Sequence, residues 1–327
     1  MGVEGLHLPN LLSICVPTYN HAHLLERLLV SIEAQWRDGV ELVVADNAST
    51  DGTRKLVADF ARKFTRVRYS RAPVNAGFDA NVRRCVETAR GTMLWLVGDD
   101  ERITDGAISR VLDTMQNAPG AIIVGDVRTE ARDGTPVKEE PSTSWPDYSV
   151  HWMDEPGSIA RYLSKATTVR AAFTFIANIV SPRQGWLGVD LEQYNLSCFT
   201  QLFALWSMVL NGVPVVVRRR TLVNAGIGNA VWRDKDSAGQ ALHVVETSER
   251  LARMVPPGPD RIALRKVWAT WYTPEYLETI HERCKHESAW PFIRLGLERM
   301  VRGGLGPEVN EVKVGAVPPV NARKKKR

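Results

Sequence analysis

The sequence predicts an α/β fold with a mainly parallel sheet flanked by helices, and three observations support this prediction. Short apolar runs rich in β-branched residues alternate with segments of roughly ten to fifteen residues whose apolar side chains recur at helical spacing. Several of these runs stop at polar residues, as strands do where a parallel sheet opens onto a ligand. At 327 residues, the chain can bury a large core. This alternation is typical of βαβ units, which form parallel sheets.

The first part of the chain follows this alternation closely. Residues 47–53, NASTDGT, are rich in turn and N-cap residues, so a helix should begin after them and present Leu56, Val57, Phe60 and Phe64 on one face. The other expected elements are strands at Leu11–Val16, Glu41–Ala45, Val67–Tyr69 and from Thr92, and helices at Ala22–Gln35, Phe78–Ala89 and Asp105–Gln116.

The second part of the chain is less regular. Residues 130–152 are polar and rich in proline and tryptophan, which is typical of a long loop or a short hairpin. Three strands and one helix are expected around this segment and after it: Ala121–Asp126, Phe173–Val180 and Val213–Val217 as strands, and Asn195–Leu210 as a helix. From about residue 236 the chain should be helical, with a turn at Val255–Pro259.

The stretch Thr92–Glu101, TMLWLVGDDE, is the most informative part of the sequence. It combines an apolar strand with a glycine and three consecutive acids. Adjacent carboxylates at a strand end are costly unless water, donors or a cation neutralise them. Oxygen ligands of this kind suit Mg²⁺ or Mn²⁺ held partly by the phosphates of a substrate. The alternative is a solvated acidic turn that precedes the next helix.

Three expected strands end in polar residues, and these ends should meet. The ends are Thr18 to Asn20, Asp46 with Asn47, and Asp99 to Glu101. Because ligands bind at the carboxyl ends of strands in such sheets, we expect one crevice lined by all three. The chain has no GxGxxG after its first strand and no GxxxxGK[ST], which argues against a dinucleotide oxidoreductase and a P-loop nucleotidase.

The charge distribution argues against a nucleic-acid-binding protein. The net charge is +5, but the last five residues, Arg323–Arg327, hold five of the 42 cations, which leaves 37 cations against 37 acids. We expect these five residues to be a flexible solubilising end or to make weak contact with an anionic membrane surface.

Composition also indicates where the protein works. No apolar run approaches the roughly 20 residues that cross a bilayer, and residues 1–10 lack a basic region followed by an apolar one. The four cysteines are scattered without CxxC spacing, as in reduced cytosolic enzymes. We therefore expect a cytoplasmic protein, peripheral to the inner face of the membrane if its basic end binds lipid.

Four motifs together resemble the GT-A fold glycosyltransferases of family two, and their residues are most similar to those of abequosyltransferase-like sugar transferases. They are VPTYN at Val16–Asn20, ADNASTDGT at Ala45–Thr53, NAGFDANV at Asn75–Val82 and WLVGDDE at Trp95–Glu101. The resemblance covers about residues 11–117. It implies a GT-A, Rossmann-like fold, here with a C-terminal helical extension, and a nucleoside-diphosphate sugar as donor.

The resemblance also implies roles for individual residues. Asp46 would accept a hydrogen bond from the base edge, which suits the N3–H of uracil or thymine. Asp100 would ligate Mn²⁺ or Mg²⁺, with Asp99 toward the ribose or the metal and Glu101 in an outer shell or at the surface. The remaining donor-binding residues would be Pro17, Thr18, Tyr19, Asn20, Asn75 and Gly77.

The general base is harder to assign. Family members usually supply it from a Glu-Asp pair early in the helix before Gly212, and the matching residues are Thr200 and Gln201, which cannot act as bases. The nearest acids are Asp190 and Glu192, and we predict that one of them takes this role. A surface loop explains both acids equally well.

Two further contacts are possible interpretations of the sequence. Trp152, Trp186 and Trp232 would form a stacking face for a sugar or an aromatic acceptor, and the arginines of residues 218–220 would contact a diphosphate.

The sequence thus predicts a metal-dependent, inverting glycosyltransferase that moves a sugar from a UDP- or dTDP-sugar to a hydroxyl or amine. The acceptor would be a small molecule or a lipid-linked glycan, such as a natural product or surface glycan. Residues 1–120 would bind the donor, residues 121–233 the acceptor within the same domain, residues 234–302 would be helical, and residues 303–327 would form a flexible basic tail. The missing Glu-Asp pair keeps open a catalytically silent nucleotide-sugar-binding subunit. A sugar nucleotidyltransferase is disfavoured because its glycine-rich arginine loop is absent.

Overall fold

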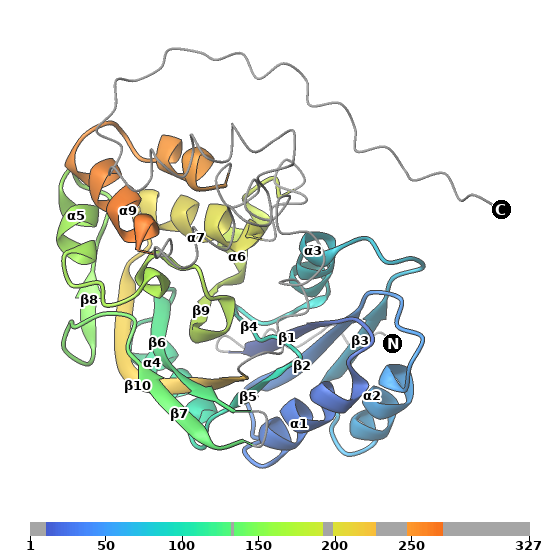
Figure 1. The fold of residues 1–327 in the computed structure, drawn as a ribbon. Helices are drawn as coiled ribbons and strands as arrows, with labels where there is room; N and C mark the ends of the chain where they lie inside the picture. Colours follow the sequence, from blue (N-terminus) through green and yellow to red (C-terminus); the bar gives the residue numbers. More distant parts are fainter. Residues whose placement is uncertain (1–10, 132–133, 192–198, 227–246, 271–327) are drawn as a thin grey trace, which may run out of the picture.

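A computed structural model describes residues 11–131, 134–191, 199–226 and 247–270. The described strands form one ten-stranded mixed sheet with the order β3-β2-β1-β4-β9-β6-β10-β5, while β7 pairs with β6 and β8 pairs with β10. Figure 1 shows α1 and α2 on one side of this sheet and α6, α7 and α9 on the other. Among the described helices, none is both long enough and apolar enough to span a bilayer.

The first half of the sheet is parallel, as the sequence predicts. In register, Thr18 of β1 lies opposite Asp46 of β2, and Cys15 lies opposite Leu96 of β4. The elements are β1 (Leu12–Thr18), α1 (Ala22–Glu33), β2 (Val40–Asp46), α2 (Thr53–Ala61), β3 (Val67–Arg71), α3 (Phe78–Thr88) and β4 (Met93–Leu96). Their bounds confirm the expected strands and helices to within a few residues.

The second half mixes strand directions. The antiparallel strand β9 lies between β4 and β6, and β10 is parallel to β6 but antiparallel to β5 and β8. The strands are β5 (Glu101–Ile103), β6 (Ile122–Glu130), β7 (Pro136–Glu140), β8 (Ser149–His151), β9 (Ile179–Pro182) and β10 (Val215–Gly226). The helices are α4 (Ala107–Asn117), α5 (Ser158–Leu163), α6 (Arg183–Leu187), α7 (Thr200–Leu210) and α9 (Pro259–Ala269), with 3₁₀ turns η1 (Val169–Ala172) and η2 (Ile176–Asn178).

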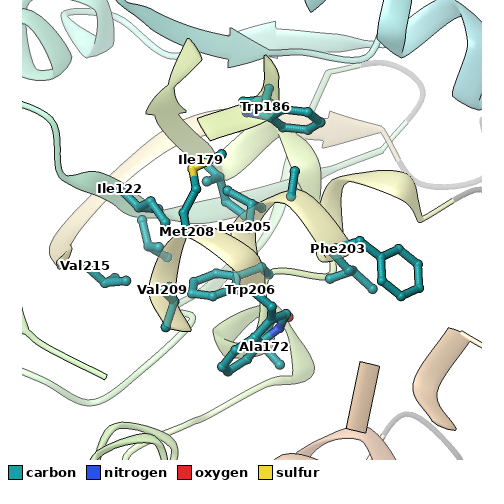
Figure 2. Packing of buried hydrophobic residues seen from close by; sticks show 14 of the residues in the cluster. Ile122, Ala172, Ile179, Trp186, Phe203, Leu205, Trp206, Met208, Val209 and Val215 are labelled. Carbon is teal, nitrogen blue, oxygen red and sulfur yellow. The ribbon is translucent and has the colours of Figure 1, made fainter. Parts of the chain in front are cut away.

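Each face of the sheet carries a hydrophobic core. Alternate residues of β4 point to opposite faces, so Leu94 and Leu96 join one core while Met93 and Trp95 join the other. The first core takes its side chains from α3, α5, α6, α7 and α9, and the second from α1, α2 and α4. Figure 2 shows part of the first core, where Met208 of α7 lies beside Ile179 of β9 and Trp206 lies beside Ala172.

Two expected elements differ from the structure. The run Phe173–Val180 is a strand only at its end, because Phe173 has a left-handed backbone (φ 67°) and η2 follows. A buried apolar run does not reveal such turns. The strand predicted at Val213–Val217 instead extends to Gly226, because Arg218 and Arg219 pair with acids of neighbouring segments instead of forming a solvated loop.

The C-terminal helices confirm part of the prediction. Residues 247–254 are helical, the turn at residues 255–258 separates them from α9, and Leu251, Leu264 and Trp268 lie in the first core. Asp260 of α9 accepts hydrogen bonds from the backbone N–H groups of Gly157 (2.6 Å) and Ala160 (2.7 Å) at the start of α5. The expected segments at residues 195–198, 227–246 and 271–327 lie outside the described residues.

Candidate functional site

The ends of β1 and β2 are joined by a set of short hydrogen bonds. The N–H of Asn47 donates to the carbonyl of Thr18 (2.9 Å), and the N–H of Asn20 donates to Oγ of Ser49 (2.9 Å). In return, Asn20 Oδ1 accepts from the N–H of Thr50 (2.7 Å). Asn20 has a left-handed backbone (φ 54°), a conformation that asparagine tolerates better than most residues. The loops after both strands therefore form one unit.

The four residues at the end of β1 differ in their accessibility. Pro17 and Thr18 are buried, whereas Tyr19 and Asn20 are exposed. The Oγ1 of Thr18 is buried and has no hydrogen-bond partner, which is unusual for a buried polar atom. Tyr19, with 40% of its surface exposed, offers an aromatic ring at the edge of the sheet.

Asn47 connects this unit to the loop before α3. Its Nδ2 donates to Asn75 Oδ1 (2.7 Å) and to the carbonyl of Gly77 (3.1 Å), and its Oδ1 accepts from the N–H of Ala76 (3.0 Å). Gly77 has φ 88°, in the left-handed region that favours glycine. The predicted donor-binding residues Asn75 and Gly77 are thus held beside the end of β2.

Asp46 is fully buried and its carboxylate already has several partners. Its Oδ1 accepts from the N–H of Ser49 (2.7 Å), and its Oδ2 accepts from the hydroxyl of Tyr69 and lies 3.4 Å from Nε of Arg71. Burial and the Asp46 carboxylate raise the pKa of Tyr69. A base edge would reach Asp46 only if Tyr69 or Arg71 moved. The Arg71 side chain is 40% exposed and therefore has room to move.

The acids after β4 occupy a poorly solvated position. Asp99 is 8% exposed, and its Oδ1 lies 3.1 Å from Nδ1 of His21. This hydrogen bond raises the pKa of His21, while burial and repulsion from Asp99 raise the pKa of Asp100. Glu101 is buried rather than at the surface: its Oε2 accepts from the N–H of Gly98 (3.2 Å), and burial raises its pKa well above the usual range.

These acids fit a cation only if a ligand supplies further oxygens. Asp99 and Asp100 are adjacent, poorly solvated carboxylates, which a divalent ion would stabilise. Within the described residues, no group of three or more His, Cys, Asp or Glu side chains lies close enough to hold an ion by itself. Mg²⁺ at nucleotide sites uses one or two carboxylates plus substrate phosphates and water. The residues therefore suit a cation that arrives with a diphosphate.

The residues predicted to supply a general base lie in different surroundings. Asp190 is exposed in the segment after α6, and Glu192 lies outside the described residues. Thr200 and Gln201, at the start of α7, are buried. The carboxylate nearest to them in the hydrogen-bond network is Asp79 of α3, whose Oδ1 accepts from the N–H of Thr200 (3.4 Å).

Sequence reasoning missed several residues of this site. The register of β2 with β3 places Arg71 opposite Asp46 and brings the hydroxyl of Tyr69 to the Asp46 carboxylate. The packing of the strand ends brings His21 to Asp99. No local sequence pattern indicates these contacts. The proposed tryptophan face is wrong at Trp186, which is buried and donates to Oγ of Ser181 (2.9 Å). Trp232 lies outside the described residues.

The proposed arginine contact with a diphosphate has another explanation. Nε of Arg218 lies 3.1 Å from Oδ1 of Asp147, and Nε of Arg219 lies 3.1 Å from Oδ2 of Asp126. Nη2 of Arg220 lies 3.9 Å from Asp147. These contacts account for the position of all three arginines without a diphosphate.

Comparison with known proteins identifies the fold around this site. Residues 13–172 match the model of glycosyl transferase family 2, and this span contains the ends of β1, β2 and β4 described above. Residues 13–172 belong to glycosyl transferase family 2. Among known proteins similar to this chain, the abequosyltransferase RfbV of Salmonella typhimurium is 26% identical over 204 residues, which cover 61% of each chain.

Other relatives match shorter stretches. The GalNAc(5)-diNAcBac-PP-undecaprenol beta-1,3-glucosyltransferase of Campylobacter jejuni is 29% identical over 102 residues, or 31% of this chain and 33% of that one. The chain therefore spans about three fifths or less of the length of these relatives. Among solved structures, S. aureus TarS 1-349 in complex with UDP-GlcNAc superposes with a TM-score of 0.63 at 13% identity, covering 90% of this chain and 81% of that one. This likeness shows that the two chains share a fold.

Proposed function

We propose that this protein is a glycosyltransferase that takes a sugar from a nucleoside-diphosphate sugar and passes it to an acceptor hydroxyl or amine. One observation carries the proposal: the hydrogen bonds of Asn47 join the ends of β1 and β2 to the loop at residues 75–77. Tyr19 lies exposed at the same edge of the sheet. The edge has an aromatic surface, a glycine that permits close approach and several polar groups, as a nucleoside site needs.

UDP or dTDP is the favoured nucleotide. Asp46 would accept the N3–H of uracil or thymine once the hydroxyl of Tyr69 turns away, and Arg71 would donate to a neighbouring carbonyl of the base. Thr18, with its unpartnered Oγ1, would contribute a hydrogen bond to the ribose. TarS, which has the same fold, was crystallised with UDP-GlcNAc, and this supports a UDP-sugar by analogy.

Asp100, with the neighbouring Asp99, would hold a divalent cation that arrives with the diphosphate. Mn²⁺ or Mg²⁺ would neutralise the charge that develops on the leaving diphosphate. The chain's own contribution is to keep these carboxylates in place: His21 fixes Asp99 through the 3.1 Å contact, and the loop from residue 98 leads directly from the buried β4.

The transfer itself moves one proton and exchanges two bonds. A carboxylate takes the proton of the acceptor hydroxyl while its oxygen attacks the anomeric carbon, and the bond to the diphosphate breaks with its electron pair. From sequence, Asp190 and Glu192 are the proposed bases. The acceptor class would be a natural product or a surface or lipid-linked glycan, consistent with the lipid-linked glycan in the name of the Campylobacter relative. Contact of residues 323–327 with anionic lipid would bring the protein to such an acceptor.

A thermal-shift panel of UDP-, dTDP-, CDP- and GDP-sugars, each with and without Mn²⁺, tests this function. We expect UDP- or dTDP-sugars to raise the melting temperature most, and Mn²⁺ to increase the shift. A response confined to guanine nucleotides would exclude base recognition through Asp46. An absence of response to every donor would contradict the proposed function.

A catalytically silent donor-binding subunit is the second candidate. It is favoured by Thr200 and Gln201, which stand in the buried first turn of α7 where family members carry the Glu-Asp pair. Release of nucleoside diphosphate from the donor that gives the largest thermal shift distinguishes the two functions. Tight donor binding without release, with and without Mn²⁺, would support the silent subunit.

A further inference from the structure

Resting on the proposed function, we infer that Asp79, in the first turn of α3, is the general base of the transfer. This assignment differs from the bases expected from sequence, Asp190 and Glu192. Asp79 places a carboxylate at the start of α7, where Thr200 and Gln201 stand in place of the Glu-Asp pair of family members. The substrate group it acts on is the attacking hydroxyl of the acceptor.

Two hydrogen-bonded anchors fix the backbone of Asp79 at the donor edge of the sheet. Two residues before it, the carbonyl of Gly77 accepts from Asn47 at the end of β2 (3.1 Å). Two residues after it, Nδ2 of Asn81 donates to the carbonyl of Ala45 in β2 (2.8 Å) and lies 3.4 Å from the carbonyl of Thr18 in β1. The first turn of α3 therefore lies against the same strand ends that we assign to the donor.

The side chain of Asp79 reaches the acceptor side. Its Oδ1 accepts from the N–H of Thr200, the first residue of α7 (3.4 Å). Asp79 is 5% exposed, so a hydroxyl that contacts it is largely shielded from bulk water. Asp190, in contrast, is exposed.

Two unpartnered polar atoms in the first turn of α7 indicate that a polar ligand group binds there. Thr200 Oγ1 and Gln201 Oε1 are buried and have no hydrogen-bond partner among the described residues. Buried polar atoms are nearly always satisfied by protein or by water. A sugar hydroxyl that accepts from the hydroxyl of Thr200 would satisfy the side chain of the same residue whose backbone N–H contacts the Asp79 carboxylate.

The step balances without any further reactant. The acceptor O–H gives its proton to the Asp79 carboxylate, its oxygen forms the bond to the anomeric carbon, and the diphosphate leaves with the electron pair of the broken bond. Asp79 then returns the proton to solvent or to the diphosphate. Water can replace the acceptor hydroxyl, so donor hydrolysis reports on the same base.

The experiment measures hydrolysis of UDP-glucose, UDP-N-acetylglucosamine and dTDP-glucose by the full chain, together with donor affinity by calorimetry. We expect Asp79→Asn to lower hydrolysis about 100-fold or more, a loss typical of a general base, while donor affinity changes less than about twofold. The asparagine can still accept from the N–H of Thr200. Formate should restore part of the activity of Asp79→Ala, because it supplies the missing carboxylate. Glu87→Gln, an exposed position on the same helix, is the matched control and should behave as wild type.

A second variant covers the case in which substitution of Asp79 prevents folding. Thr200→Val keeps the shape of the side chain and removes its unpartnered hydroxyl, so hydrolysis should fall about tenfold at unchanged donor affinity. Wild-type rates in either Asp79→Asn or Thr200→Val overturn the assignment, as does a loss in Asp190→Asn with Asp79→Asn unaffected. Failure of the wild type to bind or hydrolyse any donor would instead overturn the proposed function.

Discussion

At the scale of single residues, Asp51 connects two helices of the donor half. Its Oδ2 accepts from the N–H of Ala22 at the start of α1 (2.9 Å), and its Oδ1 accepts from the N–H (3.1 Å) and the hydroxyl (2.5 Å) of Thr53 at the start of α2. The sequence predicts N-cap residues within residues 47–53, and these bonds show Asp51 in that role. Asp51→Ala should lower the free energy of unfolding by about 1–2 kcal/mol, as loss of a cap does.

This loss should depend on pH. Burial alone would raise the pKa of Asp51, but the hydrogen bonds from Thr53 and Ala22 outweigh it and lower the pKa. A lowered pKa in the folded state means that the carboxylate stabilises the fold above its unfolded pKa, about 3.9, and that this stabilisation disappears as the pH falls further. Urea denaturation of wild type and Asp51→Ala should therefore give a difference that is constant from pH 7 to 5 and shrinks toward pH 2. A difference independent of pH would contradict the assignment; Asp105→Ala, an exposed substitution, is the control.

Asp100 should carry the cation dependence of donor binding. Burial and the neighbouring Asp99 raise the pKa of Asp100, so a cation would stabilise its charged form. Asp100→Ala should abolish the increase in donor affinity that Mn²⁺ produces, measured by calorimetry with UDP-N-acetylglucosamine. Asp105→Ala should retain it. An unchanged response to Mn²⁺ in Asp100→Ala would show that the ligand lies elsewhere.

At the scale of elements, local pattern predicts the parallel half of the sheet well, because each strand and helix there has its own periodicity. The strand β5 is different: Glu101 lies opposite Ala225 of β10, and no local pattern reveals a pairing so distant in sequence. The same reason limits the site. The strand ends are visible as motifs, but the contact of Arg71 with Asp46 depends on the register of β2 with β3.

Asn47 should keep the loop before α3 in the conformation that binds the donor. Asn47→Ala removes the three side-chain hydrogen bonds to Asn75, Ala76 and Gly77. Donor binding must then supply the free energy that orders the loop, which weakens the affinity. We expect donor affinity to fall about tenfold, which corresponds to about 1.4 kcal/mol, with little change in hydrolysis at saturating donor. Asn117→Ala, at the exposed end of α4, is the control. Unchanged affinity in Asn47→Ala would mean that the loop does not contact the donor.

At the scale of the whole molecule, the donor and acceptor halves share one sheet and its two cores. The strand β4 pairs with β1 of the donor half on one side and with β9 of the acceptor half on the other. The Nε1–H of Trp95 donates to the carbonyl of Ala177 (2.7 Å), which adds a further buried bond between the halves. The described residues on either side of residue 120 therefore belong to one shared structure.

Residues 11–120 should consequently fail to fold as a separate unit. Without the second half, Leu94 and Leu96 of β4 and Val82 and Val86 of α3 would lose the α6 and α7 side chains that cover them in the first core, and the edge of β4 would lose β9. We expect the fragment to bind a hydrophobic dye and to melt gradually in far-UV circular dichroism, because burial of such side chains drives cooperative folding. The full chain should melt in a sharp transition and bind donor. A fragment that melts sharply and keeps the donor affinity of the full chain would show that the donor half has a sufficient core of its own.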